Sequence, residues 1–293
     1  MTSRNMLTQS EIQAIFADGR KHAGIDLSGK ILPAMEFANY LPSVNTMVTH
    51  CDQAIFTGPA DFKHTVFLYN VYFISATFEG HADFENVKFD KEAYFLRANF
   101  KKGASFKEAN LYGGGDFYSA HLENADFEDA TLGHLDSSQE ICFSEAYLEG
   151  ARFKNAQIVK ASFKNTHLQN ADFEGVHFKD VVFDGADMSG ANFKGAGFEN
   201  VTFSNVNIDG IKWDGNTQLG NIKLKNVRGA SPEFREAQAR LCPLYADQAA
   251  EPVIHNPHKG DGPVNVIYGQ LDPDFRARLT ATAVTANQHV RGK

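Results

Sequence analysis

The sequence predicts an all-β solenoid, and three observations carry this prediction. A large apolar residue recurs every five or six positions from Phe62 to Trp213, and twenty of these twenty-nine positions hold Phe. The residue two places earlier is small, most often Ala, as in Ala171-Asp172-Phe173. A period of five fits neither the helical repeat of about 3.6 residues nor a long alternating strand. It fits short extended segments that turn a corner after each unit and stack in coils.

The same repeat predicts the core and the corners. A single unit cannot bury its large and small residues, but stacked coils bury both. Gly or Asn follows most large residues of the second half by two places, and these residues tolerate the left-handed backbone of tight turns. The expected core includes Phe62, Phe73, Phe84, Phe95, Phe106, Phe117, Phe173, Phe178, Phe183 and Phe193.

These features resemble the pentapeptide-repeat family, whose unit is a small residue, a polar residue, Leu or Phe, and two variable residues. The resemblance covers roughly residues 54–228 and implies a right-handed quadrilateral β-helix with four units to a coil. About seven coils are expected, which gives a rod of ~35 Å at the usual strand spacing. The first half departs from the simplest pattern, because its spacing alternates between five and six residues. Every second corner there should carry one extra residue.

Residues 1–53 are expected to form an N-terminal cap helix and a lead-in segment. Thr8-Gln9-Ser10-Glu11 is typical of a capping box, and Ile12, Ile15 and Phe16 follow on one helical face, with Gly19 as the expected end. This helix should cover the open end of the solenoid, since repeat arrays need a cap. Ile25-Asp26-Leu27-Ser28-Gly29 looks like one isolated repeat unit.

Residues 229–293 are expected to form a helical and irregular C-terminal tail. Ser231-Pro232-Glu233 is a strong helix start, and Asp272-Pro273-Asp274 predicts a second one. The tail either caps the rod or forms a dimerising element.

No catalytic, metal or cofactor site is expected. His255 and His258 are separated by Asn256-Pro257, which prevents a regular pairing of the two rings, and no hydrolase, metalloprotease or nucleotide-binding motif occurs. Gly113-Gly114-Gly115 lies at an expected corner, which explains it better than phosphate binding does.

Cysteine usage favours a reducing, cytoplasmic setting. Cys51, Cys142 and Cys242 form neither a disulfide framework nor a CxxC pair. No run of about 18 apolar residues predicts a membrane span, and no secretory signal is visible.

Apolar side chains gather at outward positions of the first coils. Alternation places five of them on one outer face, which we call the tyrosine stripe: Tyr72, Ile74, Tyr94, Leu96 and Tyr118. Tyr69 and Tyr112 lie at the neighbouring corner. A patch of this kind marks an interface. We expect a protein to cover the stripe: a partner, a second copy of the chain or one of its own terminal segments.

Charge is also unevenly distributed. The net charge of −8 belongs to residues 51–228, and no Lys or Arg occurs between Lys107 and Arg152. This acidic belt includes Glu123, Asp126, Glu128 and Asp136. It also contains the break in the repeat, residues 133–142, which should project as a loop beside the tyrosine stripe.

Two functions remain open: a non-enzymatic protein-binding scaffold and a DNA mimic. The resemblance implies the second, because well-known family members bind type II topoisomerases and protect them from inhibitors, with DNA gyrase or topoisomerase IV as partner. DNA carries about one charge per 1.7 Å, whereas eight net charges over ~35 Å are sparser. The acidic belt matches DNA locally but is spread around all faces, which favours the scaffold. Neither function involves direct nucleic-acid or membrane binding, and a homodimer through the tail or the stripe is possible.

Overall fold

The structure is a computed structural model that describes residues 6–22, 24–36, 44–45, 48–232 and 234–236. The chain divides into two compact units, Met1–Ala250 and Glu251–Lys293. The second unit, and with it the helix expected from Asp272, lies outside the described residues. Within the described ranges, no helix is long and apolar enough to cross a bilayer.

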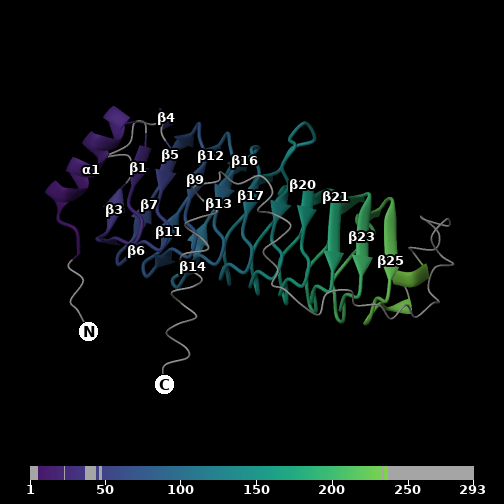
Figure 1. The fold of residues 1–293 in the computed structure, drawn as a ribbon. Helices are drawn as coiled ribbons and strands as arrows, with labels where there is room; N and C mark the ends of the chain where they lie inside the picture. Colours follow the sequence, from purple (N-terminus) through teal and green to yellow (C-terminus); the bar gives the residue numbers. More distant parts are fainter. Residues whose placement is uncertain (1–5, 23, 37–43, 46–47, 233, 237–293) are drawn as a thin grey trace, which may run out of the picture. The chain divides into compact units, whose positions relative to one another are not determined.

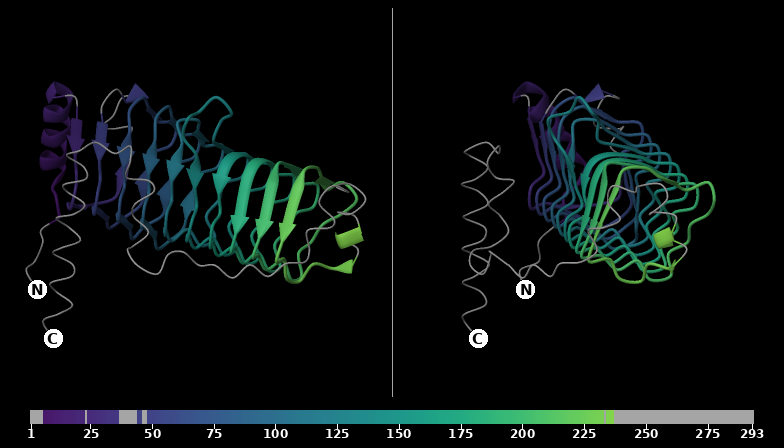
Figure 2. Two further views of the ribbon diagram at one scale, coloured as in Figure 1. Left: turned by 45° about the vertical axis from the view of Figure 1, so that its right-hand side comes forward. Right: turned by 90° about the vertical axis from the view of Figure 1, so that its right-hand side faces the viewer.

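The described part of the first unit is a β-solenoid of about nine coils (Figure 1). Every strand pairs in parallel with the equivalent strands of neighbouring coils. The pairings form four ladders, one for each face of a coil, and the view along the rod shows the coils superimposed (Figure 2).

The ladders are numbered by the order in which a coil visits them. The first contains β2 (Ile31–Leu32), β6 (Ile55–Phe56), β10 (Thr77–Phe78) and β14 (Asn99–Phe100). The second contains β3 (Met35–Glu36), β7 (Ala60–Asp61), β11 (Ala82–Asp83) and β15 (Ala104–Ser105). Isolated parallel bridges continue both ladders to the far end, as far as Arg228 and Lys212 respectively.

The third and fourth ladders run side by side along the whole rod. The third contains β4 (Val44–Asn45), β8 (Val66–Phe67), β12 (Lys88–Phe89), β16 (Asn110–Leu111), β18 (Thr131–Leu132), β22 (Gly197–Glu199) and β24 (Gln218–Leu219). The fourth contains β1 (Gly24–Asp26), β5 (Val48–His50), β9 (Val71–Tyr72), β13 (Ala93–Tyr94), β17 (Gly115–Asp116), β19 (Ile141–Cys142), β23 (Val201–Ser204) and β25 (Ile222–Lys225). Two longer strands, β20 (Gln157–Ser162) and β21 (His177–Asp184), belong to both ladders.

Coil length changes along the rod, as the alternating spacing predicts. In the N-terminal half equivalent positions of neighbouring coils are 22 residues apart, as for the hydrogen-bonded side chains of Asn86 and Glu108. In the C-terminal half they are 20 residues apart, as for Lys179 and Glu199. The two additional residues lie at the corner after the first ladder and at the corner after the third, which are diagonally opposite.

The rod is longer than the seven coils expected from residue 54, because paired strands already begin at Gly24. Strands β1–β5 supply the additional coils, and Ile25, Leu27 and Leu32 are buried in the same core. The five- and six-residue spacing does not reveal these coils, because more residues separate their paired positions than in the coils that follow. Ile31, for example, pairs with Ile55, and Met35 pairs with Ala60.

The core assignment from the repeat is confirmed. Every large repeat position from Phe62 to Ile208 is buried, and only Trp213 at the end is half-buried. The phenylalanines stack into columns along the rod axis, with ring centroids 4.5 Å apart for Phe62 and Phe84 and 5.1 Å apart for Phe183 and Phe203. Neighbouring columns meet edge to face.

The corner residues adopt the backbone expected of them. Asn155 and Asn165 have φ of 57° and 53°, and Gly175 and Gly185 lie directly above them with φ of 68° and 72°. A β-carbon on Gly185 would lie 2.2 Å from the side-chain oxygen of Asn165, so Gly185 leaves room for that side chain in its present position.

The N-terminal helix α1 (Gln9–His22) lies across the first coil (Figure 2). The predicted capping box is present: the Thr8 amide donates to the Glu11 carboxylate at 2.7 Å, and the Glu11 amide donates to Thr8 Oγ1 at 3.3 Å. Ile12 and Phe16 are buried against the solenoid. The prediction that Gly19 ends the helix is wrong, because α1 continues to His22.

A second helical turn begins at the other end of the rod. Ser231 Oγ accepts the Phe234 amide at 3.2 Å, as the Ser-Pro start predicts. Phe234 is buried and meets Trp213 edge to face at 5.6 Å. These contacts continue the core past the last coil.

The core predicts a large cost for removing one ring. Phe178→Ala should lower the free energy of unfolding by about 3–5 kcal/mol, because the Phe198 ring above and the Ile158 side chain below are held by their own coils and cannot fill the cavity. Val182→Ala on the same strand is the control, since its side chain is exposed and should cost much less. Chemical denaturation of both variants measures the difference, and equal effects would contradict the register of β21.

Candidate protein-interaction surface

The tyrosine stripe lies on the outer face of the fourth ladder, and much of it is buried. Tyr72 on β9 pairs with Tyr94 on β13 in the predicted register. Tyr72, Ile74 and Tyr94 are buried, whereas Leu96 and Tyr118 are half-buried. The stripe is therefore not an open contact surface over its first coils, and only Leu96 and Tyr118 retain appreciable exposure.

The buried part of the stripe continues a column of stacked rings. His50 stacks on Tyr72 at 4.6 Å and Tyr72 on Tyr94 at 4.9 Å, with the planes nearly parallel. The Tyr94 hydroxyl donates a hydrogen bond to the Glu92 carboxylate. Burial and that carboxylate raise the pKa of Tyr94, so the Tyr94 hydroxyl is protonated at neutral pH.

A buried carboxyl group occupies the next position of this column. Asp116 on β17 lies above Tyr94 and below Cys142, and its Oδ1 accepts the Tyr118 amide at 3.0 Å. Burial raises the pKa of Asp116 to about 6 and that of the Cys142 thiol to about 11. The thiol is therefore protonated at neutral pH, when it is a poor nucleophile.

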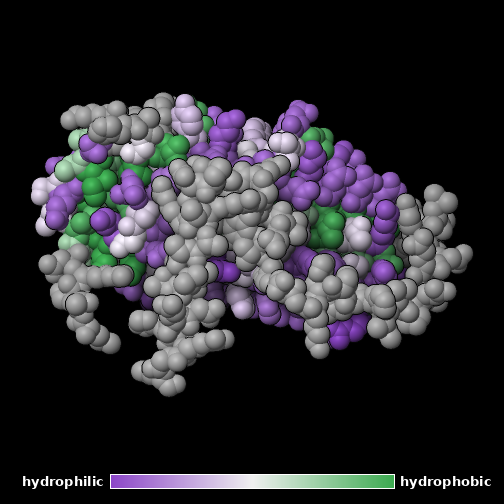
Figure 3. Space-filling model, in the orientation of Figure 1, coloured by the Kyte–Doolittle hydropathy of each residue, from purple (hydrophilic) through white to green (hydrophobic). Residues whose placement is uncertain are grey.

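Exposed apolar side chains gather instead on the neighbouring edge, between the third and fourth ladders. Tyr69, Tyr112 and Leu135 are 50%, 47% and 46% exposed, and they are three of the five exposed large apolar side chains in the described chain. Tyr69 follows β8, Tyr112 follows β16 and Leu135 follows β18, so all three lie on one edge. We call these three residues the tyrosine edge. The visible described surface is otherwise largely hydrophilic, apart from apolar areas near the N-terminal end and smaller ones elsewhere (Figure 3).

The loop that carries Leu135 stands out from the rod between β18 and β19, where the break in the repeat predicts it (Figure 1). Lys160, in the coil above, donates to the carbonyl oxygens of Leu135 and Ser137 at 2.6 and 3.0 Å. The His134 ring contacts Tyr112 with centroids 5.0 Å apart. These contacts tie the loop to the rod, and a tied loop loses less entropy when a partner binds.

Close approach between coils explains the three consecutive glycines below the loop. A β-carbon on Gly113 would lie 2.4 Å from the Lys91 backbone, and one on Gly114 would lie 2.7 Å from Gln139 Cβ. Gly114 also has φ of 101°. Packing therefore accounts for this motif, in agreement with the sequence interpretation.

The acidic belt is partly neutralised by its own basic flank. Arg152 contacts Glu128 and lies 3.2 Å from Asp126, and His121 Nδ1 lies 3.2 Å from Glu123. The loop residue Asp136 is more exposed, at 94% of its side chain, and lies 3.7 Å from the His134 ring.

Sequence reasoning identified Tyr69 and Tyr112 but not the contribution of Leu135 and Lys160. Leu135 is one apolar residue in a polar loop, and no repeat marks it. Lys160 reaches the loop because Thr131 pairs with Gln157, and this register depends on how the loop between them is accommodated.

Comparisons with known proteins identify the repeat. The family model for the pentapeptide repeat region matches residues 157–234, and the model for nine pentapeptide repeats matches residues 52–99 and 95–136. A comparison with curated protein sequences gives no significant match.

Several solved structures are similar to this chain. HetL, a pentapeptide repeat protein involved in heterocyst differentiation regulation from the cyanobacterium Nostoc sp. PCC 7120, is 16% identical, with 74% of this chain and 97% of HetL covered and a TM-score of 0.31. Full-length QnrB1, a plasmid-mediated fluoroquinolone resistance protein, is 15% identical, with 74% and 93% covered and a TM-score of 0.31. A pentapeptide repeat protein from the Arabidopsis thaliana thylakoid lumen is 24% identical, with 34% and 72% covered and a TM-score of 0.27.

The buried carboxyl group predicts a pH-dependent stability. Because the pKa of Asp116 is higher in the folded protein than in the unfolded chain, stability falls as pH rises from about 4 to about 6. Asp116→Asn should therefore raise the free energy of unfolding by about 1–3 kcal/mol at pH 7.5 and have little effect at pH 4.

Asp61 offers a matched control. It also precedes a core Phe, accepts the amide two residues later at 2.9 Å, and is only half-buried. Denaturation across this pH range should show no comparable gain for Asp61→Asn, and the same gain in both variants would refute the role of burial.

Proposed function

Because this chain belongs to the pentapeptide-repeat family, we propose that its rod is a non-enzymatic scaffold that binds a protein partner through the tyrosine edge. The observation that carries the proposal is that three of the five exposed large apolar side chains of the described chain lie on this one edge. Tyr is enriched in protein interfaces because it combines a large apolar area with a hydrogen-bonding hydroxyl.

The geometry of the edge suits docking. Tyr112 contacts the His134 ring at the base of the loop. The next loop residue after His134 is Leu135, whose side chain is exposed. Tyr69 lies two coils away along the edge, about 10 Å at the usual strand spacing. A partner that spans the three side chains would contact a rigid, preformed surface.

The chemistry of the described residues supports a binding role over catalysis. Among them, no group of three His, Cys, Asp or Glu side chains is placed to hold a metal ion. The thiols of the buried Cys51 and the half-buried Cys142 have raised pKa values, which disfavours nucleophilic catalysis by either.

The paired charges favour this scaffold over a topoisomerase-binding DNA mimic. A mimic needs acidic groups that are free to replace phosphates, whereas Asp126 and Glu128 already share Arg152. Arg152, which flanks the acidic belt in sequence, therefore lies against its carboxylates in space.

Capture from lysate with the full chain tests the proposal. The double variant Tyr112→Ala/Leu135→Ala should lose a co-purifying protein by about tenfold or more, because each side chain supplies about 1–2 kcal/mol at an interface centre. Its melting temperature should match the wild type, since both side chains are exposed.

Val182→Ala is the matched control, because Val182 is exposed on β21 and lies off the tyrosine edge. Retention of the partner by the double variant would refute this edge as the binding site, and failure to capture any partner would refute the scaffold. If purified protein changes gyrase supercoiling, and Lys substitutions at Glu123, Asp126 and Glu128 abolish the effect, the DNA-mimic function is favoured instead.

A further inference from the structure

The corner after the first ladder contains a step in the rod. Three consecutive coils have three-residue corners there, at 57–59, 79–81 and 101–103, and each packs on the one below. A β-carbon on Gly80, for example, would lie 2.3 Å from the Gly58 carbonyl carbon. The next coil has a shorter corner, Glu123-Asn124, so it leaves the third wide corner uncovered. At the end of this corner, a β-carbon on Gly103 would lie in open space.

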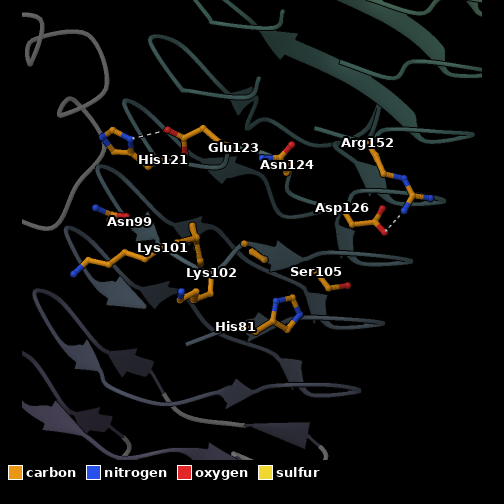
Figure 4. A pocket seen from close by; sticks show the side chains of 13 residues that line it. His81, Asn99, Lys101, Lys102, Ser105, His121, Glu123, Asn124, Asp126 and Arg152 are labelled. Atoms are coloured by element: carbon orange, nitrogen blue, oxygen red, sulfur yellow. Dashed lines mark hydrogen bonds and ion pairs between the residues drawn. The ribbon is translucent and has the colours of Figure 1, made fainter. Parts of the chain in front are cut away.

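This step creates a hollow of about 890 Å³ (Figure 4). Its lining includes three bases, Lys101, Lys102 and Arg152, and two acids, Glu123 and Asp126. The formal charge of the lining is therefore +1, in a chain whose net charge is −8. The hollow thus reverses the sign of charge that prevails on the rod.

The cations of the hollow differ in how far they are already neutralised. Lys101 lies 3.2 Å from Glu79, and Arg152 lies 3.2 Å from Asp126. Lys102 is exposed, and the described structure gives it no ion pair. An anion that enters the hollow could therefore pair with Lys102 without breaking an existing ion pair.

Two histidines also line the hollow. His81 is exposed at the lower wall, and His121 lies at the upper wall beside Glu123. A neutral imidazole carries one ring N–H that can donate a hydrogen bond to a phosphate oxygen.

We propose that this hollow binds a phosphate monoester group. Such a group carries about −1.5 to −2 charge at pH 7 and three strong acceptor oxygens. These oxygens match the Lys102 ammonium and the ring N–H donors of His81 and His121 better than the two oxygens of a carboxylate ligand would. Phe100 is the one phenylalanine in the lining, and its side chain is buried. The hollow therefore offers no phenylalanine face on which a nucleobase could stack. The recognised chemistry is the phosphate itself, carried by a phosphorylated protein side chain or present as free phosphate.

Titration of the full-length protein with inorganic phosphate tests this proposal. Saturable shifts of the Lys102, Gly103 and Asn124 amides are expected in nitrogen–proton spectra, and acetate at equal ionic strength should not reproduce them. Lys102→Glu should weaken phosphate binding by about tenfold or more, because a charge-assisted contact becomes a repulsion. Lys88→Glu is the matched control, since Lys88 is also exposed, on β12, and lies outside the hollow.

A phosphoserine peptide and its unphosphorylated counterpart distinguish the two sources of the group. Tighter binding of the phosphopeptide than of inorganic phosphate assigns the site to a phosphorylated protein, and equal binding assigns it to free phosphate. Absence of saturable shifts, equal loss of binding in Lys88→Glu, or acetate binding as strong as phosphate binding would each overturn the proposal. The tyrosine edge lies at the diagonal corner, so these outcomes are independent of the proposed protein-binding function.

Discussion

The spacing of about 4.8 Å between parallel strands constrains the rest of the rod. Aromatic rings stack at nearly the same distance, 4.8 Å for Phe84 and Phe106 and 4.9 Å for Phe163 and Phe183, so each coil places its rings directly on those below. Backbone ladder and ring column therefore repeat together. A residue added within a face would break both, whereas one added at a corner breaks neither, and the chain varies only at its corners.

The projecting loop and the charged hollow both arise where the coil length changes. The series of wide corners after the third ladder ends at the loop. In the coil above the loop, Lys160 lies in the continuous strand β20. The wide corner after the first ladder ends at the hollow, where Gly103 is left open. Neither feature needs a departure from the core pattern. The surface is shaped by the mismatch between adjacent coils.

Features that repeat could be predicted from the sequence, and features that depend on stacking could not. The burial of Phe173, the backbone at Asn155 and the position of the loop follow from local spacing. The burial of Tyr94 does not follow from local spacing. The in–out alternation of side chains shows that Tyr94 points away from the core, but it does not show what packs against its outer side. The pairing of Arg152 with Asp126 likewise joins neighbouring coils across the segment that contains the loop, so its register is defined only once the loop is accommodated.

The two coil lengths also limit how a gene for such a rod can grow or shrink. In the C-terminal half a duplication or deletion of twenty codons adds or removes one complete coil, as the pairing of Gln157 with His177 shows. In the N-terminal half the equivalent unit is twenty-two codons, as for Ile55 and Thr77. A coil copied from one half into the other would keep the ladders paired, as they are at the junction of the two halves, but it would place a wide corner against a narrow one. Each such copy would therefore create a new step on the surface of the rod.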